Sequence, residues 1–223
     1  MSIHIRMLID KDKTIFYHID NMNIKDPKKH DKILKAATKL IVSNGLADIS
    51  TTAIAKKIGI TQSNIYLYFK NKRDLLQQVY LVAVNELSLY ANRRVAEDSS
   101  LLIKMEQYTR ALYDFSIERP NTISVIDIIQ RSSNIKIGLT ESQKGLANQK
   151  IQRLLRESAS SQILRTSTVE VPRALIFNTI YFYAKGITNR TIDQKDTSLD
   201  TVVKMIMAAI LKPESNSEWL KNV

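Results

Sequence analysis

Hydrophobic side chains recur at helical spacing along most of the chain after residue 27. Between residues 28 and 44, apolar side chains at positions 33, 37, 40 and 41 fall on one face of a helix, and Gly45 supplies a stop. The same period continues over residues 72–95, 101–119, 123–129, 139–158, 170–189 and 199–211. The 223 residues include only five Gly and four Pro, so little interrupts these helices. The pattern predicts an all-α protein.

Residues 50–69 form a distinct pattern of two short helices joined by a tight turn. Ser50 or Thr51 can cap the first helix by accepting a backbone N–H, and apolar positions 54, 55 and 58 then share one face. Gly59 tolerates the left-handed conformation that ends a helix, which places the turn at residues 59–61. This spacing is typical of a helix-turn-helix.

The second of these helices carries the predicted base-reading side chains. Thr61 can cap it, and its buried contacts are expected to be Ile65 and Phe69. Its exposed N-terminal end then presents Gln62, Ser63 and Asn64, where a helix-turn-helix protein contacts base edges in the major groove. The amide of Asn64 can make a bidentate contact to adenine.

Hydroxyl groups and one lysine around these helices are candidates for contacts to the DNA backbone. A Tyr hydroxyl can donate to a phosphate oxygen, and a lysine beside a helix N-terminus adds positive charge where the helix dipole also favours anions. The candidates are Ser50, Thr52, Thr61, Tyr66, Tyr68 and Lys72. For either tyrosine the alternative is packing between helices, and for Thr52 or Thr61 it is helix capping.

The whole string closely resembles the DNA-binding domain of the tetracycline-repressor (TetR) family of bacterial transcription regulators. The matching residues are Ile54-Ala55, Gly59-Ile60-Thr61, Ile65-Tyr66-x-Tyr68-Phe69-Lys70-Asn71-Lys72 and Asp74-Leu75-Leu76. Asn64 departs from the Gly or Pro often found there, which alters the expected base preference more than the fold. The resemblance implies an N-terminal three-helix DNA-binding domain followed by a C-terminal helical ligand-binding and dimerisation domain. It further implies a homodimer on a palindromic operator, a small-molecule effector, and a repressor more than an activator.

The domain boundaries follow from the helix pattern and the resemblance. Residues 1–24 are expected to be an N-terminal extension that is disordered or forms two short strands, with Met22 as the natural start. The helix-turn-helix domain covers 25–73, a connecting helix 74–97 and the regulatory domain 98–212. The remaining residues, 213–223, are predicted to be a frayed tail in which Trp219 docks at an unknown place.

The regulatory domain contains candidates for a ligand pocket and a dimer interface. Aromatic and soft residues with a few polar groups are typical of small-molecule sites, and the candidates here are Met105, Tyr108, Tyr113, Phe177, Asn178, Tyr181 and Phe182. The two apolar helices at about 170–189 and 199–211 resemble the family's dimerisation pair, with Val203, Ile206 and Ile210 as candidate contacts. For both sets the alternative is ordinary core packing.

The formal charge of +11 at pH 7 is concentrated around the helix-turn-helix. Residues 22–94 hold 13 Lys and Arg against 5 Asp and Glu, whereas residues 95–223 hold 17 against 14. Such an excess is expected where a surface faces a polyanion. A basic solvated surface is the alternative, and the helix-turn-helix pattern favours DNA.

Several other classes of protein find little support in the sequence. There is no Cys, no glycine-rich phosphate loop, and all three His lie in the first thirty residues, so we expect no metal, no cofactor and no catalytic activity. We find no apolar run long enough to span a membrane and no signal peptide, so we expect a soluble cytoplasmic protein. A helical enzyme and a ligand-independent architectural DNA-binding protein remain the alternatives.

Overall fold

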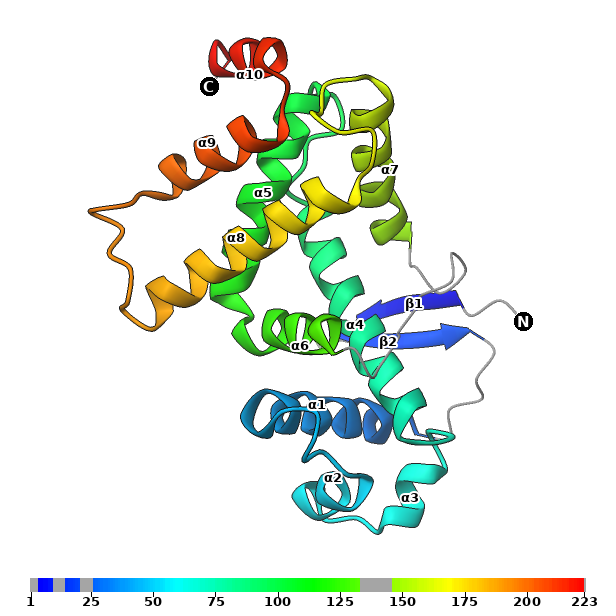
Figure 1. The fold of residues 1–223 in the computed structure, drawn as a ribbon. Coiled ribbons are helices and arrows are strands. Elements are labelled where there is room, and N and C mark those ends of the chain that lie inside the picture. The colour runs from blue at the N-terminus through cyan, green and yellow to red at the C-terminus, as the bar shows by residue number, and fades with distance from the viewer. Residues whose placement is uncertain (1–3, 10–14, 21–25, 133–145, 223) are drawn as a thin grey trace. The chain divides into compact units, whose positions relative to one another are not determined.

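A computed structural model describes residues 4–9, 15–20, 26–132 and 146–222 (Figure 1). The chain divides into two compact units. The first comprises Met1–Glu86 and Asn121–Leu146, and the second Leu87–Pro120 and Ala147–Val223. The expected start at Met22 lies outside the described residues. The boundary differs from the predicted one in that the helix after Pro120 belongs to the first unit.

The first unit is helical apart from an N-terminal hairpin. It contains α1 (Pro27–Asn44), α2 (Thr51–Ile58), α3 (Gln62–Tyr66), the first part of α4 (Lys72–Asn92) and α6 (Pro120–Arg131). The hairpin pairs β1 (His4–Ile9) with β2 (Ile15–Asp20) in antiparallel register, with His4 opposite Asp20. The two short strands expected there are thus present, and the helical fold is confirmed.

Side-chain caps fix the starts of three helices in the first unit, and the cap of α2 by Ser50 is one that the sequence predicts. The Asp26 carboxylate accepts the Lys29 backbone N–H at 3.1 Å, and Pro27 occupies the first turn of α1. Ser50 caps α2 by accepting the Ala53 N–H at 3.0 Å. A side-chain oxygen of Asn71 likewise accepts an N–H in the first turn of α4 at 2.9 Å. The caps satisfy backbone donors that a helix start leaves unpaired.

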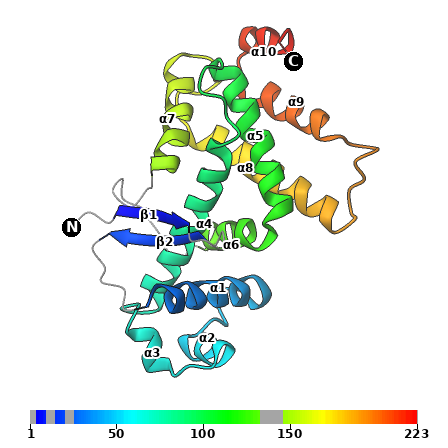
Figure 2. The same cartoon turned by 180° about the vertical axis from the view of Figure 1, so that it is seen from behind.

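The second unit is a helical domain built around α5 (Leu101–Glu118). Its other helices are the end of α4, α7 (Leu146–Ser160), α8 (Glu170–Thr188), α9 (Leu199–Ile210) and α10 (Pro213–Leu220). Figures 1 and 2 show α8 crossing α5, and α9 and α10 also contact α5. Fully buried side chains such as Met105, Leu112 and Phe115 of α5 form the core. No described helix is long and apolar enough to cross a membrane.

The C-terminal tail is not frayed, which corrects the sequence prediction. Residues 213–220 form α10, and Trp219 is only 1% exposed. The indole Nε1 of Trp219 donates to the Glu106 carboxylate on α5 at 3.0 Å, and Arg110 Nε donates to the same carboxylate at 2.8 Å. Arg110 also pairs with Asp200 of α9 at 2.7 Å. A buried hydrogen bond and an ion-pair network therefore hold α10 on α5.

Candidate nucleic-acid interface and ligand pocket

The helix-turn-helix has the geometry that its sequence predicts. Gly59 ends α2 with φ 71°, in the left-handed region, and its N–H bonds back to the carbonyls of residues 55 and 56. Ile65 and Phe69 are 0% and 1% exposed, so they fix the α3 segment in the core of the unit. The turn and these two anchors leave the first turn of α3 facing outward.

The three predicted base-reading side chains lie on that first turn. Gln62 and Ser63 are exposed and Asn64 is half-buried. The amide Nδ2 of Asn64 donates to Thr61 Oγ1 at 2.8 Å, and Lys29 Nζ of α1 donates to Asn64 Oδ1 at 3.5 Å. Both ends of this amide are therefore held by neighbouring side chains. No DNA is present, so base contact remains a prediction for all three residues.

Thr61 occupies the N-cap position of α3 but does not cap the helix with its side chain. Its hydroxyl is hydrogen-bonded instead to Asn64, as above, and to Ser63 Oγ at 2.8 Å. The sequence assigned Thr61 to capping or to the DNA backbone. The structure shows a third role, in which Thr61 links two of the predicted base-reading residues.

The predicted backbone contacts differ in how much surface they present. Ser50, Thr52 and Lys72 are exposed, and Tyr66 is 50% exposed. Tyr68 is only 7% exposed, with its ring centroid 6.2 Å from that of His30, so it packs between helices as the alternative held. Leu67, which lies directly after α3 between these two tyrosines, was not among the predicted contacts, yet it is 65% exposed.

A buried polar cluster around His30 packs against Phe69, one of the two anchors of the α3 segment. The His30 ring stacks on Phe69 with centroids 4.9 Å apart, and His30 Nε2 lies 2.9 Å from Gln78 Oε1. Gln78 Nε2 in turn donates to Asp74 at 3.1 Å. The Gln78 amide oxygen is therefore the atom that faces His30, and because this oxygen can only accept, His30 Nε2 is the donor. Burial lowers the pKa of His30, against smaller opposing effects of Gln78, Asp31 and Asp74. The lowered pKa favours the neutral imidazole over the protonated ring in the folded protein.

Lysines along α1 add positive charge to the first unit. Lys28, Lys32, Lys35 and Lys39 are exposed. Lys35 pairs with Asp31 at 2.7 Å, and Lys32 Nζ donates to a carbonyl of α2 at 3.5 Å. These long side chains keep their charged ends at the surface, which suits contact with phosphates.

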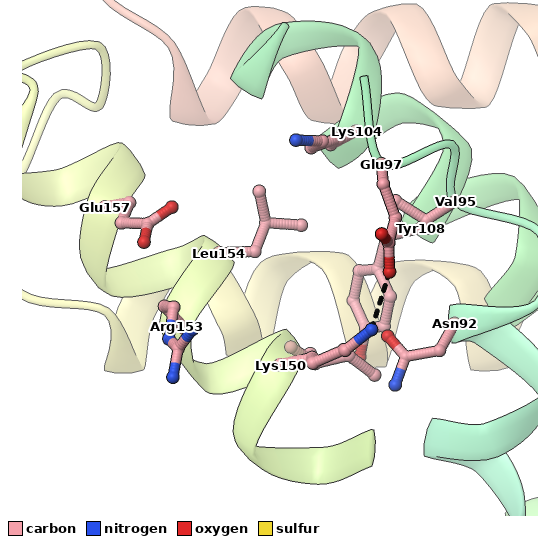
Figure 3. Close-up of a pocket in the computed structure, with 10 residues that line it drawn as sticks. Asn92, Val95, Glu97, Lys104, Tyr108, Lys150, Arg153, Leu154 and Glu157 are labelled. Carbon is pink, nitrogen blue, oxygen red and sulfur yellow. Dashed lines mark hydrogen bonds and ion pairs between the residues drawn. The ribbon is translucent and has the colours of Figure 1, made fainter. Parts of the chain in front are cut away.

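The second unit holds a cavity of about 300 Å³ between the end of α4, α5 and α7 (Figure 3). Apolar side chains and an aromatic ring meet charged groups in it. Its lining residues are Asn92, Val95, Glu97, Lys104, Tyr108, Lys150, Ile151, Arg153, Leu154 and Glu157. In Figure 3, Lys104 and Tyr108 extend from α5, and Leu154 and Glu157 from α7, toward the space between the helices. The size is at the lower end of small-molecule sites.

The charged and polar groups that line the cavity differ in their interactions with one another. Lys150 pairs with Glu97 at 2.7 Å at the exposed rim, and this pairing lowers the pKa of Glu97. Burial raises the pKa of Tyr108 to about 12, with Arg173 opposing, so its hydroxyl stays protonated and able to donate. Among the described residues, Lys104 and Arg153 have no ion-pair partner within 4.0 Å.

Only Tyr108 of the seven predicted pocket residues lines this cavity. Met105 is fully buried, Phe182 is 71% exposed, and Phe177 stacks with Tyr181 at 6.2 Å within α8. Tyr113 bonds with Gln194, and Asn178 is exposed. The residues that line it were missed because they come from three separate helices and the loop after α4, and several are charged.

The predicted dimer contacts on α9 are buried within the single chain. Val203, Ile206 and Ile210 are 0%, 3% and 2% exposed, so they have almost no surface to offer a second copy. Ordinary core packing, the alternative for these residues, describes them in this chain. Exposed apolar side chains lie elsewhere in the unit, on α8 at Val171, Leu175 and Phe182 and on α9 at Met205.

Comparisons with known proteins agree with the helix-turn-helix. The family model "Bacterial regulatory proteins, tetR family" matches residues 33–79. The "Fatty acid metabolism regulator protein" of Bacillus subtilis is 27% identical over 161 residues, which cover 71% of this chain and 82% of the relative.

Solved structures share the fold over most of the chain. A TetR family transcription regulator from Marinobacter aquaeolei superposes with a TM-score of 0.71 at 16% identity, covering 86% of this chain and 100% of that one. The regulator FadR from Bacillus subtilis, solved in complex with stearoyl-CoA, gives 0.57 at 21% identity, covering 81% and 99%. The two-part helical architecture is therefore one that transcription regulators have.

Proposed function

The chain belongs to the tetR family of bacterial regulatory proteins, and we propose that it is a ligand-responsive repressor that binds a palindromic operator as a homodimer. The observation that carries this proposal is the first turn of α3, where three polar side chains lie outward on a fixed helix-turn-helix. A protein of this kind acts in the cytoplasm, where its DNA is. The similarity to the "Fatty acid metabolism regulator protein" of Bacillus subtilis favours this function over a helical enzyme.

In this proposal α3 enters the major groove and reads bases through Gln62, Ser63 and Asn64. Tyr66 and Lys72 bind phosphates on either side, together with the hydroxyl groups of Ser50 and Thr52. The exposure of these side chains supports the assignment. Tyr68 contributes through packing on His30, and its buried position makes it the weakest of the backbone candidates.

The homodimer is proposed to form through α8 and α9, which pack against each other in the second unit. Residues 171, 175, 178 and 182 are spaced to share one face of α8, and three of them are large exposed hydrophobics. Met205 adds a 64% exposed side chain on α9. An apolar stripe of this kind marks an interaction surface, and a two-fold axis would pair it with its own copy. Phe182 and Met205 therefore replace Val203, Ile206 and Ile210 as the proposed contacts.

The cavity of the second unit is proposed to bind the effector. Val95, Ile151 and Leu154 offer an apolar lining, whereas Lys104 and Arg153 offer positive charge. This combination suits an amphipathic anion. Stearoyl-CoA, which FadR from Bacillus subtilis holds, belongs to that class and is the first compound to test.

Release of DNA would be transmitted through α4. This helix starts beside the base-reading turn at Lys72 and ends at Asn92, which lines the cavity. A ligand can weaken DNA binding only as far as it prefers the state that does not fit the operator. A 100-fold loss of affinity corresponds to ~2.7 kcal/mol, and DNA must weaken effector binding by the same factor.

A selection experiment tests the DNA-binding function directly. The full chain is incubated with a library of random duplexes, and bound DNA is sequenced. We expect one motif made of two inverted half-sites, with centres about 34–36 Å apart, since a dimer presents its two recognition helices one turn apart. Recovery of DNA without a shared motif would refute the regulator and favour the architectural alternative.

The effector is then tested on the selected duplex. Adding stearoyl-CoA should release wild-type protein, and Lys104→Ala should need a higher concentration, because the cation that meets the anionic group is gone. Leu220→Ala, on an exposed part of α10, serves as the control. Binding of the compound without any change in DNA affinity would show that the cavity is not coupled to the operator.

A further inference from the structure

Thr51 connects the two helices of the helix-turn-helix through its hydroxyl group. Gln62 Nε2 of α3 donates to Thr51 Oγ1 at 2.8 Å, and the Tyr66 hydroxyl lies 3.3 Å from the same oxygen. Thr51 is only 6% exposed, whereas Gln62 is exposed and Tyr66 is 50% exposed. One buried hydroxyl thus touches a predicted base-reading side chain and a predicted phosphate-binding side chain.

Capping of α2 does not account for this hydroxyl. Ser50 is the N-cap of α2, and its own side chain accepts the Ala53 N–H at 3.0 Å. Thr51 is the first residue inside the helix, and within the part of the chain that the structure describes its hydroxyl is hydrogen-bonded to the side chains of Gln62 and Tyr66. Both partners come from α3, so the hydroxyl orients side chains of the recognition helix.

The direction of the hydrogen bonds follows from the number of protons. Thr51 accepts from the Gln62 amide and has one proton of its own. A phosphate oxygen can only accept, so Tyr66 must use its proton for the phosphate when DNA binds. Thr51 then donates to the Tyr66 oxygen. Three hydrogen bonds therefore run in series: from Gln62 to Thr51, from Thr51 to Tyr66, and from Tyr66 to the DNA backbone.

These hydrogen bonds also determine which donor and acceptor groups of Gln62 remain available to contact a base. An amide has two N–H donors and one oxygen, and one N–H is already given to Thr51. One N–H and the oxygen remain to contact a base. In the major groove, adenine offers an acceptor at N7 beside a donor at N6, whereas guanine offers two acceptors. The held amide fits adenine.

We propose that Thr51 is a positioning residue for base readout, holding the Gln62 amide for adenine and aligning the Tyr66 hydroxyl with the adjacent phosphate. The proposal rests on the DNA-binding function proposed above. It adds a residue that touches no base and yet determines a base preference. Because hydrogen bonds in a chain polarise one another, loss of the middle hydroxyl affects both ends.

The test compares variants of the full chain on DNA selected from a random library. Thr51→Val removes the hydroxyl and keeps the shape, and Thr51→Ser keeps the hydroxyl. Gln62→Ala removes the amide that is proposed to contact the base. Thr38→Val, whose hydroxyl donates within α1 to the Leu34 carbonyl at 3.0 Å, is the matched control for the substitution itself. Affinities are measured on the selected duplex, on single base-pair variants of it and on unrelated DNA.

Wild type, Thr51→Ser and Thr38→Val should prefer adenine at one position of each half-site by roughly 5- to 150-fold, the range of a bidentate contact. Thr51→Val should lose most of that preference. The double variant Thr51→Val, Gln62→Ala should show the same adenine preference as Gln62→Ala alone, because Thr51 acts through Gln62.

Two results would overturn the proposal. Thr51→Val could keep the adenine preference, or it could weaken selected and unrelated DNA by the same factor while lowering the melting temperature, as a purely structural residue would. A wild-type chain that selected no sequence at all would instead refute the DNA-binding function, and that outcome is visible before any variant is made.

Discussion

Phe182 provides the sharpest test of the proposed homodimer. It is 71% exposed in the single chain, at the C-terminal end of the apolar stripe on α8. Burial of a Phe side chain is worth about 1.5–3 kcal/mol, and a two-fold interface buries two copies. Scaling by the exposed fraction, Phe182→Ala should weaken the dimer by about 2–4 kcal/mol. This corresponds to a rise of about 30- to 1000-fold in the dimer dissociation constant.

Sedimentation velocity over a dilution series measures that constant. Leu220→Ala is the matched control, because Leu220 is also an exposed apolar residue, at 48%, but lies on α10. Since the two half-sites are bound together, the weaker dimer should also need more protein to occupy the operator. An unchanged dissociation constant for Phe182→Ala, with the helical content of the chain preserved, would refute an interface on this face of α8.

Three further predictions concern the first unit and the C-terminal helix. His30 has a lowered pKa, so the folded state prefers the neutral ring; the stability it contributes is present above the ordinary value of 6.5 and is lost as pH falls below it. The melting temperature should therefore drop between pH 7.5 and 5, and less so in His30→Gln; equal drops would contradict this. Lys72→Ala should weaken all DNA sequences alike and reduce the salt dependence by about one unit of slope, measured by titration at several salt concentrations. Trp219→Phe should lower the free energy of unfolding by about 1–3 kcal/mol in urea, because Glu106 loses a buried donor; no change would mean that α10 adds no stability.

The helix-turn-helix could be predicted from sequence because its signals are local. Ser50 and Gly59 act within one turn of their own position, and the buried anchors Ile65 and Phe69 follow from the helical period. The orientation of side chains on α3 could not be predicted in the same way. The bond from Gln62 to Thr51 depends on how α2 and α3 cross, which no local pattern specifies.

The cavity and α10 were missed for a related reason. The cavity is lined from α4, α5 and α7, and charged residues such as Lys104 and Glu157 give no sign in sequence that they share a space. Proline is common just beyond the end of a helix, but it is also favoured in the first turn, which is where Pro213 lies in α10. What holds the resulting short helix is Trp219 on Glu106, a contact across 113 positions.

The proposed dimer face shows the limit of hydrophobic periodicity. Helix α9 is apolar on two sides, with Val203, Ile206 and Ile210 inward and Met205 outward. The period shows that a helix has an apolar face, but not which of two such faces packs on its own chain. In the single chain Val203, Ile206 and Ile210 are buried and Met205 is exposed, which supports Met205 as the proposed contact.

The buried indole of Trp219 also gives the protein an optical signal of its own. The chain has a single Trp, so all tryptophan emission comes from one place in the second unit, beside the Glu106 carboxylate on α5. Lys104 and Tyr108 of the cavity lie on the same helix. Any movement of α5 against α10 would alter the polarity around the ring and shift the wavelength of its fluorescence, while events confined to the base-reading helix would leave that wavelength unchanged. An effector titration followed by emission would thus register the second unit alone, without a dye and without DNA.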